Sequence, residues 1–372
     1  MDTGLTEEQS ELAGAVRALL ERHAPTGASR AAAESPSGFD AKLWGMLVEE
    51  MGAAAVAIPE EFDGLGATLV EAGIVLEELG YSLAPTPYLA SAMLAGQAIL
   101  AAGEADSCAR LLPAIASGSQ RAALAWAAPS GRWDPTAVGI AAAPRDDAWM
   151  LTGSAPLVLD GEGADVLIVL ARTPDGPALF ELGAMDDATI TPTPALDPML
   201  RVARVELEAA QARLLSADAD VISRIATLAR ASISAMQVGV AQRALDMTVE
   251  YSLQRVQFGR QIGSFQALKH RMADMHVKVE TARSIARAAT AALAAGDPDA
   301  ERLSLAAKSW CSEALSLTAS EAIQLHGGIA ITWEHDAHLI FKRAHALGQL
   351  FGQPHEVRRA YAAHQVGASA SS

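Results

Sequence analysis

The pattern of apolar residues changes twice along the 372 residues, and the order of the three resulting segments limits the folds that the chain can adopt. Apolar residues first recur at helical spacing, as they do from Leu12 to Leu20, and a further helix is expected over 88–101. From about Arg121, short apolar runs are broken by Gly, Pro and Asp, which is typical of strands joined by tight turns. From about Asp218, long helical stretches return, and they are expected over 221–254 and 264–295. The sequence therefore predicts an α+β fold in the order helices, a small antiparallel β unit, helices.

Local signals mark where individual elements begin and end. Thr6 and Gln9 form a capping-box pattern ahead of the first helix. Pro174-Asp175-Gly176 lies between two apolar runs, and it predicts a hairpin because Pro fixes φ while Gly permits a positive φ. Gly296-Asp297-Pro298 predicts that one long helix ends at the Gly and that the next is capped by the Asp, with Pro in its first turn.

Charge and composition exclude several classes of function. The formal charge is −16 and there is no run rich in Lys or Arg, so we expect no nucleic-acid partner. Two cysteines far apart in sequence predict neither a disulfide framework nor a metal site. The longest charge-poor stretch, 82–103, is interrupted by two prolines, so we expect no membrane span. The acidic first residues do not resemble a signal peptide, and we expect a cytoplasmic protein.

Three segments carry a family resemblance, and they occur in the order that the family shows. IPEEFDGLG (58–66), followed by EELG (77–80), resembles the N-terminal signature of acyl-CoA dehydrogenases. RVQFGRQIGSFQALKHRMADM (255–275) and EAIQLHGGIAITWEHD (321–336) resemble the two C-terminal motifs of the same family. The resemblance implies an N-terminal helical domain (1–118), a middle antiparallel β-barrel or sandwich (119–215) and a C-terminal four-helix bundle (216–372).

The resemblance also implies a reaction and a cofactor. In the family, a carboxylate removes the α proton of an acyl-CoA thioester and FAD accepts the β hydrogen as hydride. The flavin is shared, because the C-terminal domain of a neighbouring chain holds its pyrophosphate and adenosine. The residues implied for that role here are Arg255, Phe258, Gln266, Gln324, Leu325, His326, Gly327 and Gly328. An Arg fork suits pyrophosphate oxygens, and Gly-Gly lets backbone N–H groups approach phosphate closely.

The chain departs from the family where the catalytic base belongs. At the spacing of the family's Glu-Gly step, counted from Gln324, the sequence has Phe351-Gly352. The alternative base position, directly before the Arg that matches Arg230, is Ala229. Neither side chain can accept a proton, so we expect no catalytic base in this chain. Arg230 is an implied substrate-binding residue, although the Asp that relatives carry three residues earlier is Thr227 here.

The predicted β unit departs from the family as well. Relatives pack a Trp and a Thr of one strand on the flavin ring, and Leu157 and Leu159 stand in their places. The Ser-rich loop that touches flavin and substrate in relatives is replaced by AAPSGRWDP (127–135), in which Ser130 and Trp133 could still serve. The chain therefore keeps the half of a flavin site that is given to a neighbour and has lost the half that it would use itself.

These departures resemble the base-less β subunit of heterotetrameric acyl-CoA dehydrogenases that act on steroid side-chain CoA thioesters. We therefore predict an α2β2 assembly with two FAD molecules, in which a homologous α subunit supplies the base. We expect an acyl-CoA substrate and an electron-transfer flavoprotein or a similar electron acceptor.

Two other hypotheses remain open at this point. A self-sufficient dehydrogenase would need a displaced base, for which Glu334, Asp336 and Glu356 are candidates. A scaffold subunit that binds no flavin would have no need for the cofactor motifs. His335 and His338 have a spacing that could place two metal ligands on one helix face, but nothing else in the sequence supports a metal site, and we expect none.

Overall fold

The structure is a computed structural model that describes residues 4–146 and 148–370. It divides the chain into two compact units. The helical unit comprises the residues up to Ala28, residues 73–84, and the residues from Arg230 on. The barrel unit comprises residues 29–72 and 85–229. The division of the chain into three domains stays a prediction.

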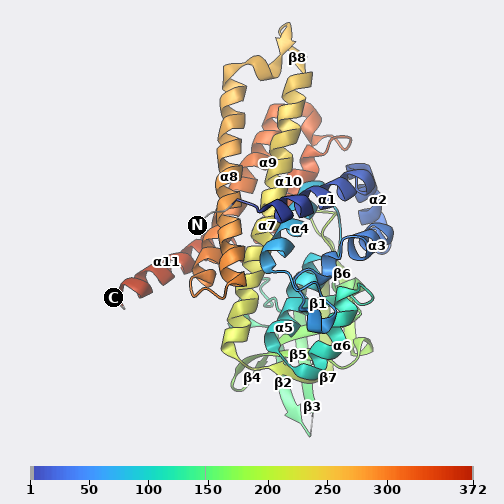
Figure 1. The fold of residues 1–372 in the computed structure, drawn as a ribbon. Helices are drawn as coiled ribbons and strands as arrows, with labels where there is room; N and C mark the ends of the chain where they lie inside the picture. The colour runs from blue at the N-terminus through green and yellow to red at the C-terminus, as the bar shows by residue number, and fades with distance from the viewer. Residues whose placement is uncertain (1–3, 147, 371–372) are drawn as a thin grey trace. The chain divides into compact units, whose positions relative to one another are not determined.

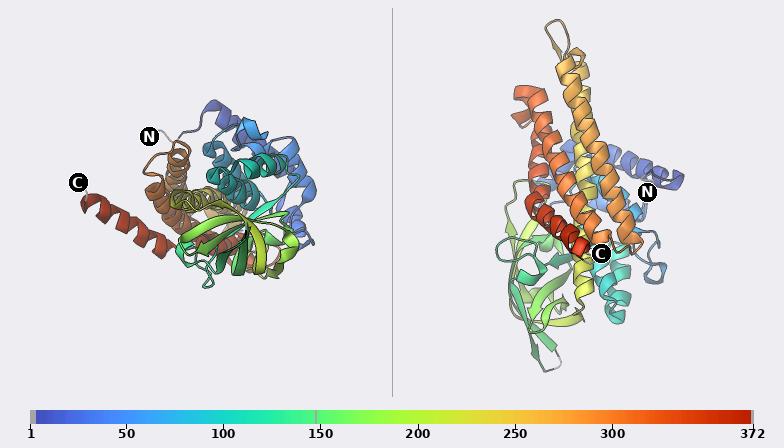
Figure 2. Two further views of the ribbon diagram at one scale, coloured as in Figure 1. Left: turned by 90° about the horizontal axis from the view of Figure 1, so that it is seen from below. Right: turned by 90° about the vertical axis from the view of Figure 1, so that its left-hand side faces the viewer.

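The helical unit is built mainly from long helices that lie side by side (Figures 1 and 2). α9 packs against α8, α10 and α11. α11 extends away from the other helices of the bundle (Figure 2). The helices are α1 (Glu7–His23), most of α4 (Leu69–Ser82), most of α7 (Ala219–Gln254), α8 (Gln266–Ala294), α9 (Ala300–His326), α10 (Ala337–Gln349) and α11 (Pro354–Ala370).

Local sequence explains the ends of several of these helices. The Thr6 side chain accepts from the Gln9 N–H and the Gln9 side chain accepts from the Thr6 N–H, so the capping box is confirmed. Gly296 has the positive φ expected after a helix end. The predicted cap at Asp297 is displaced, since α9 begins only at Ala300. Asp297 instead accepts a hydrogen bond from the Asp299 N–H, which stabilises the turn before the helix.

The barrel unit closes a sheet upon itself. The strands are β1 (Ala122–Ala125), β2 (Ile140–Arg145), β3 (Ala148–Leu159), β4 (Val166–Thr173), β5 (Gly176–Leu182), β6 (Ala188–Thr193) and β7 (Val202–Ser216). Their order is β1-β4-β2-β3-β7-β5, and β5 returns to pair with β4, which closes the barrel. β6 adds to β7 at the side. The predicted hairpin is confirmed, because β4 and β5 are antiparallel with Thr173 opposite Gly176.

The sheet is antiparallel except where β1 and β2 pair with β4. β1 pairs with β4 in parallel, and β2 touches β4 in parallel at one residue pair. A strand of four consecutive buried residues such as β1 has no alternation from which its direction can be predicted. The barrel core is aliphatic, with Leu151, Val169 and Phe180 fully buried.

Short helices complete the barrel unit. They are α2 (Thr26–Glu34), which begins in the helical unit, α3 (Ala41–Glu49), α5 (Gln97–Ala102) and α6 (Ala105–Ala116). A π-helical stretch, Leu89–Gly96, precedes α5, and all eight of its residues are buried. No helix in the described ranges is long and apolar enough to cross a membrane.

Candidate cofactor-sharing site

A two-stranded hairpin joins α7 to α8 at one end of the helical unit (Figure 1). Its strands are β8 (Val256–Gln257) and β9 (Arg260–Gln261). The turn residues Phe258 and Gly259 both have positive φ, 52° and 77°, as a tight hairpin turn requires. A bulky residue rarely adopts this conformation, and the Phe258 side chain is 92% exposed. The hairpin therefore presents an aromatic ring to solvent.

Arg255 and Gln266 flank this hairpin at the end of α7 and the start of α8. The Ile262 N–H donates to the Arg255 carbonyl at 2.9 Å, which fixes the stem of the hairpin. Both side chains are exposed. Within residues 4–146 and 148–370, the Arg255 guanidinium and the Gln266 amide have no intrachain hydrogen-bond or ion-pair partner. Their donors are therefore available to another molecule.

The Gln324–Gly328 segment lies at the C-terminal end of α9. Gln324, Gly327 and Gly328 are exposed, and Gly327 has a φ of 66°. A Cβ atom built on either glycine would meet nothing within 4 Å, so open space lies beside this part of the backbone. The Gly327 N–H donates to the Ile323 carbonyl at the end of α9. Such a loop lets a phosphate approach the main chain.

His326 is the buried member of this segment and connects it to α7. Its Nδ1 lies 2.7 Å from the Ala322 carbonyl, and its ring stacks on Tyr251 at 4.4 Å between centroids. His335 packs on the other rings at 4.6 Å from His326. Burial lowers the pKa of the His326 imidazole, which favours the neutral ring. Tyr251 lies one helical turn before Arg255, so this stack brings the two cofactor motifs together.

Sequence reasoning missed the structural role of Tyr251. Its only signal is a position four residues before Arg255, whose N–H donates to the Tyr251 carbonyl at the end of α7. His335 and His338, considered above as a metal pair, have other contacts, because His335 joins the stack and His338 Nδ1 lies 2.6 Å from the His335 carbonyl. Among the described residues, no group of three or more His, Cys, Asp or Glu could hold a metal ion.

The two positions of the family's base are apolar and buried. Phe351 follows α10, is 2% exposed and has a φ of 58°, and Gly352 follows it with a φ of 113°. Ala229, in α7, is fully buried. Nothing at either position can accept a proton.

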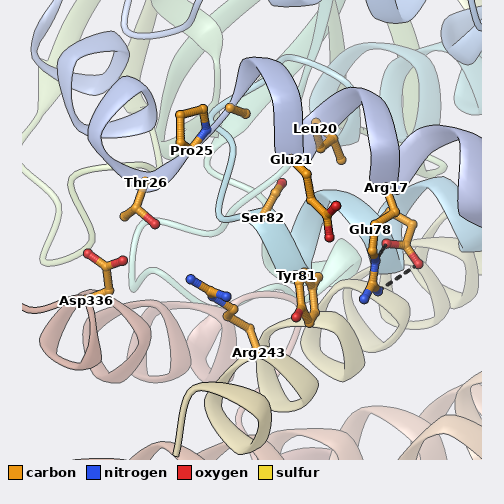
Figure 3. A pocket seen from close by; sticks show the side chains of 11 residues that line it. Arg17, Leu20, Glu21, Pro25, Thr26, Glu78, Tyr81, Ser82, Arg243 and Asp336 are labelled. Carbon is orange, nitrogen blue, oxygen red and sulfur yellow. Dashed lines mark hydrogen bonds and ion pairs between the residues drawn. The ribbon is translucent and has the colours of Figure 1, made fainter. Parts of the chain in front are cut away.

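The three candidates for a displaced base lie in different surroundings. Glu334 is exposed. Glu356 accepts from the Gln353 N–H, which is a capping contact at the start of α11. Asp336 lines a cavity of about 400 Å³ in the helical unit, facing Arg243, Thr26 and Tyr81 (Figure 3). Asp336 is the one of the three that faces a cavity.

Arg230 is a half-buried cation with buried donors. Its Nε and Nη1 atoms have no hydrogen-bond partner among the residues that the structure describes. Burial lowers the pKa of this guanidinium, and the charge of Glu301 acts in the opposite direction. Thr227, where relatives carry an Asp, is 3% exposed. A buried donor without a partner lowers the stability of the folded protein, so Arg230 is suited to donate hydrogen bonds to an oxygen of a ligand.

The 127–135 loop of the barrel unit lies against one residue of the strand that the family resemblance places against flavin. In the 127–135 loop, the Ala128 N–H donates to the Arg132 carbonyl at 2.8 Å. Trp133 packs on the buried Trp126, with ring centroids 5.4 Å apart. A Cβ on Gly131 would lie 3.6 Å from Leu157 Cδ1. The loop therefore folds over Leu157 of β3.

The chain matches two family models that together cover most of its length. The model described as acyl-CoA dehydrogenase, N-terminal domain, matches residues 6–119. The model described as acyl-CoA dehydrogenase, C-terminal domain, matches residues 219–366. The chain belongs to the acyl-CoA dehydrogenase family.

Individual relatives agree over almost the whole chain. The acyl-CoA dehydrogenase IpdE2 of Mycolicibacterium smegmatis is 41% identical over 355 residues, which is 95% of this chain and 98% of the relative. IpdE2 of Mycobacterium tuberculosis is 42% identical over 353 residues, covering 95% and 96%. A structure of the Tcur3481-Tcur3483 steroid ACAD has a TM-score of 0.91 at 32% identity, covering 98% and 99%. The ChsE4-ChsE5 complex from Mycobacterium tuberculosis has a TM-score of 0.91 at 29% identity, also covering 98% and 99%.

The fold and the reaction class expected from the sequence are thereby confirmed. The chain has the acyl-CoA dehydrogenase fold and belongs to a family of FAD-dependent oxidoreductases that act on CH–CH bonds. The residues present also suit FAD, because unpartnered Arg and Gln donors lie on the two motifs that the Tyr251–His326 stack joins. Beside them, the Gly327-Gly328 backbone is open to a phosphate.

Proposed function

We propose that this chain is the base-less subunit of a heteromeric FAD-dependent acyl-CoA dehydrogenase. Its homologous partner supplies the catalytic carboxylate and the surface for the flavin ring. One observation carries the proposal: Arg255, Gln266 and Gln324, which are suited to a neighbour's cofactor, have exposed side chains without a partner among the described residues. At the base positions, by contrast, the side chains are those of Phe351 and Ala229. When bound, FAD accepts a hydride from the β carbon of the acyl-CoA thioester.

Each residue of the site has a distinct task in this proposal. Arg255 offers a charged fork to the pyrophosphate oxygens. Gln266 and Gln324 donate and accept hydrogen bonds at the adenosine end, beside Leu325. Gly327 and Gly328 leave room beside the main chain for a phosphate, and Gly328 presents its backbone N–H. Phe258 covers the cofactor with its exposed ring. Arg230 binds an oxygen of the acyl-CoA substrate.

The surface around the site supports a protein partner. Six large apolar side chains at the end of α7, in the hairpin and in the segment after α9 are 44–92% exposed: Leu253, Val256, Phe258, Ile329, Ile331 and Trp333. Exposed apolar groups gathered around one site are typical of an interface. An α2β2 assembly with two FAD molecules would cover them, with an electron-transfer flavoprotein or a similar protein as the electron acceptor.

Two similar structures support a class of substrate. One similar structure is named a steroid ACAD, and another is a complex of two different chains, ChsE4 and ChsE5. We therefore propose a CoA thioester of a steroid-derived acyl group as the substrate, processed by a complex of two different subunits.

A self-sufficient enzyme with Asp336 as the base is the second candidate. The observation in its favour is the cavity that Asp336 lines with Arg243 and Tyr81. Its cavity lies within the helical unit and includes no residue of the barrel unit, where the family's flavin ring lies. An Asp336→Asn variant separates the two candidates, because only the self-sufficient enzyme would lose its turnover.

The decisive experiment is flavin stoichiometry. The chain is produced alone and together with a homologous dehydrogenase subunit encoded beside it, and FAD per chain is measured with the oligomeric mass. We expect a colourless lone chain and one FAD per two chains in the complex. Arg255→Gln should release FAD from the complex, whereas the surface variant Lys42→Met should not. A yellow lone chain with one FAD per chain that oxidises an acyl-CoA would refute the proposal.

A further inference from the structure

A fully buried lysine lies in α9, and its hydrogen bonds connect α9 to α10. The Lys308 ammonium donates to Ser312 Oγ at 2.8 Å and to the carbonyls of Leu347 and Gly348 at 3.1 Å each. Lys308 is 0% exposed. An ammonium group has three N–H donors, so these three acceptors use all of them. A lysine is rarely this buried, and this one has a complete set of partners.

The acceptors on α10 are carbonyls that the helix itself cannot satisfy. α10 ends at Gln349, and Leu350 already has extended backbone, so the last carbonyls lack partners within the helix. From α7, the Gln237 amide donates to the same Leu347 carbonyl at 3.1 Å and to Ser312 Oγ at 3.0 Å. A cation at a helix C-terminus also suits the helix dipole. Lys308 therefore caps α10 from a neighbouring helix.

The N-terminal end of α10 is joined to the segment that contains Gly327 and Gly328. α9 ends at His326 and α10 begins at Ala337, so residues 327–336 form a loop whose two ends are held by two packed helices. The shape of this connection depends on where α10 sits along α9. A slip of one helical turn would move one end of the connection by about 5 Å relative to the other. A contact that fixes the register of α10 on α9 therefore also fixes the Gly327-Gly328 step.

We propose that Lys308 is a positioning residue for the cofactor: by capping α10 from α9, it holds residues 327–336 in the conformation that receives the pyrophosphate and adenosine of FAD. This inference rests on the proposed function, in which Gln324–Gly328 contact the cofactor. Lys308 itself acts at a distance, through the register of the two helices.

The charge state of Lys308 should make its hydrogen bonds to α10 depend on pH. Burial lowers the pKa of its ammonium to about 7. The titratable group that interacts with Lys308 is the Cys311 thiol, and burial raises the pKa of that thiol to about 12, so it is neutral between pH 6 and pH 9. Gln237 and Ser312, which share the hydrogen bonds, are uncharged. A neutral amine has two N–H donors and a lone pair, so it cannot serve three acceptors. The cap is complete below pH 7 and loses a hydrogen bond above it.

The test measures FAD binding by the assembled complex from pH 6 to pH 9. In the unmodified complex, we expect the dissociation constant of FAD to rise about tenfold across this range as Lys308 loses its proton. Lys308→Met, which keeps the shape of the side chain without its donors, should bind FAD about tenfold more weakly at pH 6 and show no such rise. Lys42→Met, an exposed lysine of α3, should match the unmodified complex.

Arg255→Gln separates a failure of this inference from a failure of the proposed function. If Arg255→Gln loses FAD while Lys308→Met keeps the affinity and pH profile of the unmodified complex, the role of Lys308 is refuted and the proposed function stands. If Arg255→Gln keeps FAD, the proposed function itself fails. If Lys308→Met does not assemble, Gln237→Leu replaces it. That variant removes one donor to Leu347 and should weaken FAD binding a few-fold with the pH dependence retained, and an unchanged affinity would refute the inference.

Discussion

Asp160 shows how a single side chain sets a pH dependence at the residue scale. It follows β3 with a φ of 51°, and burial raises the pKa of its carboxyl to about 7 in spite of Arg201 and Arg121 nearby. The unfolded chain has the ordinary value near 4, so between about pH 4 and pH 7 the folded protein holds the extra proton. Stability should therefore fall as the pH rises through this interval.

Asp160→Asn should remove that fall. Asn tolerates the left-handed backbone and carries no charge, so the variant should be more stable at pH 8 by about 1 kcal/mol and unchanged at pH 4. Thermal melting of the assembled protein at both pH values measures this. Asp175→Asn, in the turn between β4 and β5, is the matched control and should leave the pH dependence as it is. Parallel curves for Asp160→Asn and the unmodified protein would contradict the assignment.

Single residues also show what can be predicted from sequence at a site. The absence of a carboxylate at Phe351 and Ala229 is a matter of residue identity, so the sequence alone indicates it. The role of Lys308 could not be predicted, because two of its three acceptors are backbone carbonyls on a helix 39 and 40 residues away. The stacking of Tyr251 on His326 was equally hidden, since it depends on how two helix ends meet.

At the scale of elements, α4 and α7 pack closely because two glycines face the opposite backbone. A Cβ on Gly239 of α7 would lie 1.8 Å from the Glu77 carbonyl oxygen, and one on Gly80 of α4 would lie 2.2 Å from the Met236 carbonyl oxygen. Both obstacles are main-chain atoms, so a methyl group would force the helices apart. We expect Gly239→Ala to destabilise the protein by about 2–3 kcal/mol in denaturant unfolding.

Gly14→Ala is the control for helix propensity. Gly14 is an exposed residue of α1, and a Cβ there would meet nothing within 4 Å. That variant should gain up to about 1 kcal/mol, since Ala favours a helix over Gly. If Gly239→Ala also gained stability, the close approach of α4 and α7 would not be the reason for its glycine.

The elements differ in how far their sequences reveal them. α7 and α8 were predicted to within two residues at each end, because their apolar periodicity continues over many turns. α2 was missed, because TGASRAAAE has alanines where a helix would show larger apolar residues. The helix predicted over 88–101 is π-helical up to Gly96, a local widening that no periodicity indicates. The parallel pairing of β1 depends on the path of the chain rather than on its four residues.

At the scale of the whole molecule, the proposal divides one active site between two unlike chains. In the family, the base and the flavin-ring surface of a site come from the same chain, and this chain departs at both. Phe351 replaces the base, and the 127–135 loop folds over Leu157 in the barrel unit. Restoring the base alone should therefore leave the site formed by this chain inactive, because the surface for the flavin ring would still be missing.

Phe351→Glu tests this division directly. In the complex, we expect one FAD per two chains and turnover within about twofold of the unmodified enzyme, because a carboxylate without a flavin ring has no hydride acceptor. Phe351→Leu controls for the loss of the buried ring, and replacing the glutamate of the partner subunit should abolish turnover. A rise to one FAD per chain, or a doubled turnover, would show that this chain keeps a complete flavin surface and lacks only the base. In that case the subunit would be a dormant enzyme rather than a dedicated half-site, and the loss of the carboxylate would be its one functional difference from its relatives.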